Sequence, residues 1–579
     1  MNRYPWPRSA LKPALWAPFR WLGMASRKSG RAPRRQFQPR RGEREAVVYT
    51  WVRGPETLEG YASHRAEHRI RGQWSADRNA LCCSRPSRPA GDLSLRLAGR
   101  PALCSSFTAL AYKPGFLLRA LGSDEVYYSL RVVEAYRGRS LGNPYLAGHE
   151  AAVIYMPEMV ERGLALAARA LRVAPLNLLA LSRVLFPVAI FLVLYDLSRR
   201  LGAGRRFAVL AAACAPLALG PYSFGSPLRY FRTVSPSSYV LLMLLAVRLL
   251  WQVQCRRSAA VVCLAGAAVG LLFYTPLYYC SFVLGALLLL VVSEKQRQPR
   301  IALLTALVLG LVLGLPYLFH AVAIKDLPAV RDALTNGRLL MPGRGPEAGC
   351  LLLFAIGMFV AGWVWLWRAR LGPPARFLLP FLLAASFLLI QDVFTNLHMQ
   401  SGHWRNCLAP FCGVAVFLLL EKSSLSPEKL FALAGLLFFI GALSSQAAGY
   451  KQWRASLPDN PDLWLDRRMP ETIAWLNANT PPGAVVLSGE DVSCTLPLFT
   501  HNKVYWCYFA QQYAMEESEA IARRWQAQSW ASAPLPLTYR ADYYLGIGNR
   551  DCRLGTGSTV YENQQEATCL YAIHGAHGK

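Results

Sequence analysis

The chain has 579 residues, 53% of them apolar, and a mean hydropathy of +0.22. Several segments are long and apolar enough to cross a bilayer, which indicates a polytopic membrane protein and argues against a soluble enzyme with one large core. The net charge of +29 does not indicate nucleic acid, because much of it lies in the first hundred residues and most of the rest at the ends of apolar segments. The sequence has no Walker A loop, no GxGxxG after a strand and no paired CxxC with zinc spacing.

Residues 1–110 are the first predicted region. They are rich in Arg, Pro and Ser, include the basic run RKSGRAPRRQFQPRRGERE, and show no sustained period of 2 or 3.6. Three interpretations stay open: an arm for anionic lipid, plain disorder, or sequence that is not native coding sequence. We favour disorder and expect no compact fold in this region.

The second region, 111–175, holds a degraded first helix and the first outer loop. A first span would fall near 101–120, but Lys113-Pro114 interrupts it. A polar stretch follows at 121–150, and residues 155–172 resemble an amphipathic helix at the membrane interface because charged residues interrupt their apolar face.

The polar stretch carries the acid pair Asp124 and Glu125. Ser123 before them is a good helix N-cap, and the apolar residues that follow recur at helical spacing, which predicts a short amphipathic helix. Carboxylates in a first turn can act as a general base, hold a metal, or only face solvent where they favour the helix dipole. The third interpretation is the simplest for this stretch taken alone.

The third region, 176–446, is predicted to hold about ten transmembrane helices, or eleven with the interrupted segment. The apolar spans lie near 176–197, 207–222, 239–254, 259–275, 277–293, 301–320, 349–368, 377–392, 408–420 and 429–446. Alternate loops are short and rich in Arg and Lys, which predicts that they are cytoplasmic. The loops 223–238, 321–348 and 393–407 are then outer loops, together with residues 121–175 and the tail.

The tail, 447–579, has the composition of a small soluble α/β domain outside the cytoplasm. Helices are predicted at 469–479 and 515–528, and strands at 484–489, 503–509, 542–548, 558–563 and 568–573. Its cysteines are Cys494, Cys507, Cys552 and Cys569. In an oxidising compartment they can pair in three ways, and buried free thiols are the alternative.

This layout resembles the GT-C superfamily of integral membrane glycosyltransferases, which use lipid-phosphate-linked sugars. The resemblance lies in the acid pair on the first outer loop, the interfacial helix after it, the number of spans and the outer tail domain. It extends over roughly 120–575 and includes SDEVYYSLRVVEAYRGRSLGNPYL, RYFRTVSPSS and SGHWRNCLAPF. The nearest likeness is to the bacterial branch that transfers mannose and arabinose. The first span departs from the family pattern, and the second acid is Glu where many members have Asp.

The resemblance implies an inverting transfer of sugar from a polyprenyl-phosphate carrier, with Asp124 as general base and Glu125 as its partner or alternative. Cations of the outer loops would stabilise the leaving phosphate. The remaining substrate-binding candidates are Arg229, Arg232, His403, Arg405, His149, Glu150 and Tyr127. Each has a structural alternative, such as an Arg that extends to lipid head groups or a loop anchored by an interfacial Trp. Arg183, inside a span, is a further functional candidate.

No cofactor is fixed by these residues, although a divalent metal on the phosphate is an option. The implied partners are the lipid-linked donor, an acceptor that the sequence does not identify, and the lipid bilayer, with no nucleic acid. The implied location is the bacterial inner membrane. A transporter or flippase of a lipid-linked glycan is an alternative function, as is a non-catalytic envelope scaffold. Few ionisable groups in the spans and no internal repeat argue against transport.

Overall fold

The computed structural model describes residues 123–214 except 150–151 and 154–155, then 233–336, 341–342, 348–395, 397–398, 401–423, 469–512, 515–530, 537–548 and 558–573, with a few single positions between them. The chain divides into two units, Met1–Ala98 and Gly99–Lys579, and every described residue belongs to the second. The predictions for 1–110, the interrupted segment 101–120 and nearly all of the span 429–446 therefore lie outside the described residues.

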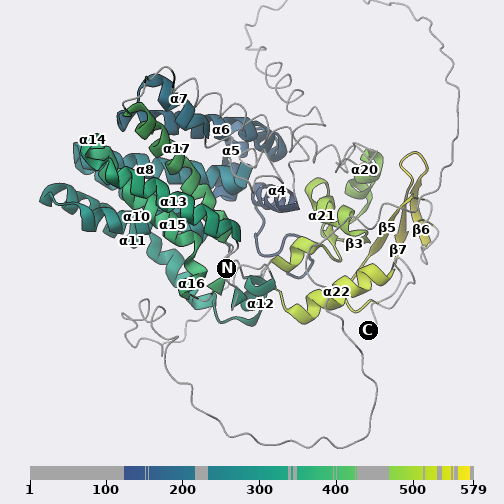
Figure 1. Ribbon diagram of the computed structural model, residues 1–579. Helices are drawn as coiled ribbons and strands as arrows, with labels where there is room; N and C mark the ends of the chain where they lie inside the picture. Colours follow the sequence, from purple (N-terminus) through teal and green to yellow (C-terminus); the bar gives the residue numbers. More distant parts are fainter. Residues whose placement is uncertain are drawn as a thin grey trace, which may run out of the picture. The chain divides into compact units, whose positions relative to one another are not determined.

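The predicted spans of the middle region are helices wherever the structure describes them. We call α6 to α17 the apolar bundle, which Figure 1 shows in blue to green. Its main helices are α6 (Pro175–Arg200), α7 (Arg205–Cys214), α8 (Tyr239–Arg256), α9 (Ala259–Leu271), α10 (Leu277–Ser293), α11 (Arg297–Ile324), α13 (Ala348–Leu366), α15 (Pro373–Leu389) and α17 (Arg405–Glu421). Shorter pieces join them: η3 (Thr233–Ser238), η4 (Leu272–Tyr274), α12 (Pro328–Asn336), α14 (Arg368–Leu371), α16 (Gln391–Thr395) and η5 (Ser401–Trp404).

The bundle has the surface of a protein made for lipid. Among the described residues, four helices are long and apolar enough to cross a membrane: Pro175–Arg200, Val234–Arg256, Arg297–Ile324 and Gly349–Leu366. Large apolar side chains face outward, with Leu366 76%, Val292 74% and Phe359 71% exposed. An aqueous surface would rarely carry so many apolar residues on adjoining helices.

Glycines let α9 and α11 approach each other closely inside the bundle. A Cβ at Gly270 would lie 2.6 Å from Leu313 Cβ, and one at Gly314 would lie 2.4 Å from the Phe273 ring. Such contacts are typical of helix packing in membranes, where close van der Waals contact replaces the hydrophobic effect as the main source of association.

The loops that the charge pattern assigns to one side of the membrane contact one another. Among the predicted outer loops, β1 (Met341–Pro342) pairs with β2 (Leu397–His398), α12 packs on the tail, and η3 packs on the helix that carries the acid pair. Among the predicted cytoplasmic loops, Gly204 N–H donates to the Glu421 carboxylate, and Arg257 bonds Gln296 and Gln298. These contacts agree with the alternation of loops that the sequence predicts.

The tail domain, described over 469–573, is a five-stranded sheet with helices, as the sequence predicts. It consists of α20 (Pro470–Asn479), β3 (Val485–Ser488), α21 (Glu490–Phe499), β4 (Lys503–Val504), η6 (Tyr508–Gln512), α22 (Glu517–Trp530), β5 (Tyr543–Ile547), β6 (Ser558–Asn563) and β7 (Thr568–Ala572). The strand order is β4-β3-β5-β7-β6; β3 is parallel to β4 and β5, and β7 is antiparallel to β5 and β6. Helices α21 and α22 lie on opposite faces of the sheet (Figure 1).

One strand prediction for the tail was wrong in its extent, and one helix of the tail was not predicted. The strand expected over 503–509 ends at Val504, because Cys507 is drawn toward α21 by a disulfide and the chain turns into η6. Helix α21 was not predicted, since Ser, Thr and an internal Pro497 weaken its helical pattern. The cysteines pair as Cys494–Cys507 and Cys552–Cys569, which is one of the three open connectivities.

Candidate active site

The acid pair lies in the first turn of α4 (Ser123–Tyr136), so the predicted short helix is confirmed. The side chains of Asp124 and Glu125 lie outside the described residues, but the faces of the following turns are clear. Tyr127, Leu130 and Val133 belong to the hydrophobic core of the tail domain, whereas Val132 belongs to the core of the bundle. Over the turns that follow the acid pair, helix α4 therefore packs against two cores, that of the tail domain and that of the bundle.

Helix α5 (Met159–Leu171) packs against α4 and is joined to it by side-chain contacts. The Arg131 guanidinium lies 2.7 Å from Glu161 Oε1, and both side chains are only 1% exposed. Arg131 also donates to the Pro157 carbonyl at 3.0 Å. At the far end, Arg169 donates to the carbonyls of Ala135 and Tyr136 in the last turn of α4. A cation at a helix C-terminus also favours the helix dipole.

Glu134 is the centre of a second charged cluster, on α4 itself. Arg137 NH1 lies 2.8 Å from Glu134 Oε1, Arg139 NH1 lies 3.4 Å from it, and Lys503 Nζ of the tail lies 3.6 Å from Oε2. Glu134 is 2% exposed and Lys503 5%. The buried Glu134 carboxylate thus pairs with three cationic side chains, one of which, Lys503, belongs to β4.

The segment Asn143–Leu146, with sequence NPYL, follows the edge of β4. Val504 N–H donates to the Tyr145 carbonyl at 2.8 Å, and Lys503 Nζ donates to the Pro144 carbonyl at 2.8 Å. Asn143 shapes the turn, because its Oδ1 accepts the N–H of Tyr145 and its Nδ2 donates to the Ala510 carbonyl. The segment covers an edge strand that would otherwise expose unpaired backbone groups.

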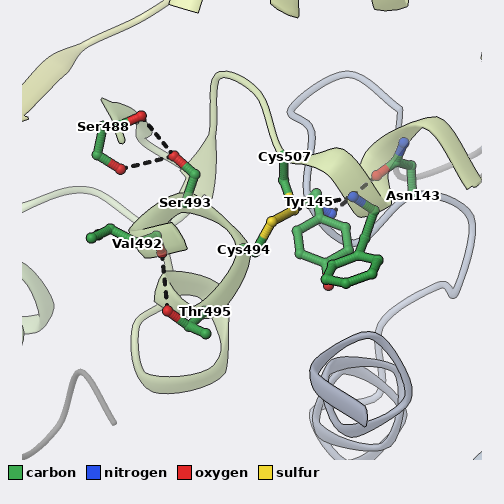
Figure 2. Close-up of a disulfide and its surroundings, with 9 residues drawn as sticks. Asn143, Tyr145, Ser488, Val492, Ser493, Cys494, Thr495 and Cys507 are labelled. Atoms are coloured by element: carbon green, nitrogen blue, oxygen red, sulfur yellow. Dashed lines mark hydrogen bonds between the residues drawn. A yellow bond between two sulfur atoms is a disulfide. The ribbon is translucent and has the colours of Figure 1, made fainter. Parts of the chain in front are cut away.

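Tyr145 and the Cys494–Cys507 disulfide belong to the same hydrophobic cluster, and Figure 2 shows them together with Asn143. Burial, followed by the neighbouring Tyr127, raises the pKa of Tyr145 well above its usual value. The Tyr145 hydroxyl therefore stays protonated. Tyr127, a predicted substrate-binding residue, is 2% exposed and donates its hydroxyl to Met156 Sδ at 3.0 Å; its predicted role remains a prediction.

His149, another predicted substrate-binding residue, faces α22. Its Nε2 lies 3.0 Å from Glu519 Oε1, and Glu519 in turn accepts from Arg523 at 2.7 Å. Arg523 also donates to the Tyr505 carbonyl and lies over the Tyr539 ring. Sequence reasoning placed His149 near the acid pair but did not predict this second connection to the tail. Its neighbour Glu150 lies outside the described residues.

His403 and Arg405 lie where η5 passes into α17. The His403 ring stacks on Tyr278, with centroids 4.6 Å apart and an 11° angle between the planes. Trp404, which lies between His403 and Arg405 in the sequence, is 1% exposed and donates its Nε1 hydrogen to the Tyr278 carbonyl at 3.1 Å. This hydrogen bond fixes the loop to the start of α10. The loop is therefore anchored by a buried Trp, and not by a Trp that lies in the lipid interface. The side chain of His398 lies outside the described residues, as do Arg229 and Arg232.

Two buried charged residues of the bundle add to this region. Arg183, which the sequence already singled out, is 5% exposed on α6, a helix that packs against α4, α5 and η3. Asp392 in α16 is 3% exposed and accepts a hydrogen bond from the Gln391 amide. Sequence reasoning missed Asp392, although an acid beside a predicted outer loop is a usable signal. Within the described ranges, no group of three or more His, Cys, Asp and Glu side chains is arranged to hold a metal ion.

Comparisons with known proteins give likenesses among solved structures. No protein-family model matches the sequence, and no curated protein matches it either. The fold is similar to two crystal structures of ArnT from Cupriavidus metallidurans, one bound to undecaprenyl phosphate and one in the apo state. In each case the identity is 14%, the TM-score is 0.49, and the match covers 83% of this chain and 98% of the other. Identity and overlap of this size assign no activity to this chain.

Proposed function

We propose that this protein is a membrane glycosyltransferase that moves a sugar from a polyprenyl-phosphate carrier to an acceptor on the outer face, with Asp124 as general base. The observation that carries the proposal is the position of α4. Its first turn holds two acids, and its body is built into both the bundle and the tail domain. A helix that only displayed solvated acids would not need two cores to hold it.

The placement of this site outside the cytoplasm is part of the proposal. The predicted outer loops contact α4, the tail and one another, so they share a side. Both described disulfides lie in the tail, whereas Cys255, Cys263, Cys280, Cys407 and Cys412 of the bundle are free thiols. Disulfides persist in oxidising compartments, which supports an outer tail and, with it, an outer α4.

The chemistry is a single displacement at C1 of the sugar. The acceptor oxygen forms a bond to C1 while the bond from C1 to the phosphate oxygen breaks, and the electron pair leaves with the phosphate. The acceptor proton passes to the carboxylate of Asp124. Because attack and departure occur on opposite faces, the configuration at C1 inverts. Successive residues of an α-helix lie about 100° apart around its axis, so one of the two acids would act as the base, and Glu125 would support Asp124 or replace it.

Cations are needed to stabilise the phosphate as its charge develops. The candidates are Arg229 and Arg232, which lie outside the described residues, and His403, Arg405 and Arg183. The stacked ring of His403 and the buried anchor of Trp404 hold the start of α17 rigidly, which is what a preorganised phosphate site requires. A metal ion would act on the same phosphate oxygens if one takes part.

The test is transfer of labelled sugar from mannosyl- and arabinosyl-undecaprenyl phosphate by the purified full chain in lipid nanodiscs, with a membrane extract as the acceptor source. We expect Asp124→Asn to lower the rate by about 10²–10⁴-fold, the usual contribution of general base catalysis. Asp326→Asn is the matched control, because Asp326 is 87% exposed on a different loop. Full activity in Asp124→Asn would exclude Asp124 as the base, and a bound lipid sugar that is moved across the membrane without turnover would favour a transporter.

A further inference from the structure

We propose that Lys503 is a positioning residue for the transfer reaction: from β4 of the tail domain it fixes α4, and with it the two acids of the first turn, through Glu134. This inference rests on the proposed function, because it takes the first turn of α4 as the reacting part. It adds a role for the tail domain, which the proposed chemistry does not otherwise use.

Lys503 holds two parts of the first outer loop at once. Its ammonium group donates to the Pro144 carbonyl at 2.8 Å and lies 3.6 Å from Glu134 Oε2. Both charged side chains are almost fully buried, so solvent screens their attraction little. The backbone of the next residue, Val504, donates to the Tyr145 carbonyl, which keeps the ammonium group aligned.

A shift at Glu134 reaches the acids because a helix moves as a rigid rod. Ten residues separate Glu134 from Asp124, a distance of about 15 Å along the axis at 1.5 Å per residue. A small tilt of α4 at its C-terminal half therefore displaces the first turn. Displacement of a catalytic group by about 1 Å can cost up to about a hundredfold in rate.

The other cations of the cluster hold α4 to the tail less directly. Arg139 contacts Glu134 from the same segment of chain. Arg137 reaches the tail only through the Pro497 carbonyl, at 3.3 Å. Loss of Lys503 is therefore expected to loosen α4 without releasing it, which predicts a partial loss of rate.

The experiment uses the full chain in nanodiscs and the variants Lys503→Met, Lys503→Arg and Arg540→Met. Arg540 is the matched control, since it is a cation of the same domain that pairs with Asp542 and is 58% exposed. For each variant, hydrogen exchange of the 123–136 amides and transfer kinetics are measured. We expect Lys503→Met to speed that exchange and to lower kcat about tenfold, with KM for the donor changed less than about threefold. Lys503→Arg should recover most of both, and Arg540→Met should change neither.

Glu134→Asp is the second variant, for the case in which Lys503→Met does not fold. It keeps the charge but shortens the side chain by one methylene, and we expect the same loss in kcat with little change in KM. A kcat and an α4 exchange rate equal to wild type in Glu134→Asp or in folded Lys503→Met overturn the inference while the proposed function stands. An inactive wild-type chain contradicts the proposed function instead, and the exchange of 123–136 in Lys503→Met then decides whether Lys503 positions α4.

Discussion

The apolar bundle and the tail domain stabilise their folds by different means. The bundle exposes large apolar side chains and packs its helices closely at glycines. The tail buries its apolar residues within a sheet and adds ion pairs and two disulfides. The difference teaches that the two regions are stabilised for different surroundings, the bundle for lipid and the tail domain for water.

Helix α4 packs against both the bundle and the tail domain, so we expect its substitutions to have the largest effects on stability. Arg131 of α4 pairs with Glu161 of α5, and each side chain is only 1% exposed, as buried as a core residue. Neither lipid nor water screens such a pair. Changes here should therefore have larger effects than changes deep in either region.

The largest expected effect is that of Arg131→Met. Removal of one partner leaves the Glu161 carboxylate buried and unpaired, which typically costs about 3–5 kcal/mol of stability. The measurement is thermal unfolding of the purified chain in detergent. In the Arg131→Met/Glu161→Met double variant most of the loss should be recovered, because two apolar side chains of similar volume leave no buried charge. An unchanged midpoint in Arg131→Met would show that α4 is not held by this pair.

The second largest expected effect is the loss of a disulfide, which should destabilise the tail domain and leave the bundle unchanged. The Cys494→Ser/Cys507→Ser variant opens a disulfide that spans 13 positions and should destabilise the tail domain by about 3 kcal/mol. Local hydrogen exchange reports it: amides of β3 and β4 should exchange faster, whereas amides of α9 and α11 should not change. An equal loss of exchange protection in both regions would contradict the distinction, since it would mean that the bundle and the tail domain unfold together.

A smaller effect sharpens the account of the bundle. Gly314→Ala places a methyl group 2.4 Å from the Phe273 ring, and overpacking of this kind costs about 1–3 kcal/mol. Gly362→Ala on α13 is the matched control, because its added methyl group has no heavy atom within 4 Å. Thermal unfolding in detergent should show a loss in the first variant and no loss in the second. Equal behaviour of the two would mean that the packing of α11 against η4 does not depend on this close contact.

The smallest effect concerns pH and is limited to the tail. Burial raises the pKa of Tyr505 to about 12, above the ordinary value of 10.0, against the opposing effect of Arg523. The unfolded chain therefore loses its proton first, so stability is full below pH 10 and falls as the pH rises toward 12. At pH 11, one unit above the unfolded pKa and one unit below the folded pKa, the loss is about 1.4 kcal/mol, the free energy of one pKa unit. Tyr505→Phe should flatten the decline in denaturant titrations, and an unchanged slope would contradict the assignment.

Much of this fold could be predicted because the signals are local. Apolar runs of membrane length locate the helices of the bundle, and runs of β-branched and aromatic residues locate β3, β5, β6 and β7. The strand expected over 503–509 has the same pattern, yet a disulfide to a helix that was not predicted redirects the chain after Val504. Local pattern does not contain that information.

The candidate site divides in the same way. Helix α4 and its acids follow from spacing, but the residues that hold α4 do not. Arg131 and Glu161 are 30 positions apart, and Lys503 is 359 positions from the Pro144 carbonyl that it binds. One sequence gives no sign that charges so far apart are partners. His149 shows the same limit. It precedes the bundle in the sequence, whereas Glu519, which it contacts, follows the bundle.

The edge contact between NPYL and β4 also has a consequence for synthesis. Pro144 leaves the ribosome 359 residues ahead of Lys503. At about 5–20 residues per second, Tyr145 and Leu146 wait roughly 20–70 seconds before β4 exists to cover them. During that time the nascent loop leaves the side chains of Tyr145 and Leu146 uncovered, and a chaperone or the translocation machinery would have to protect them. A chain that stops after the bundle would stay in that unprotected state permanently, so premature termination should lead to degradation of the whole protein.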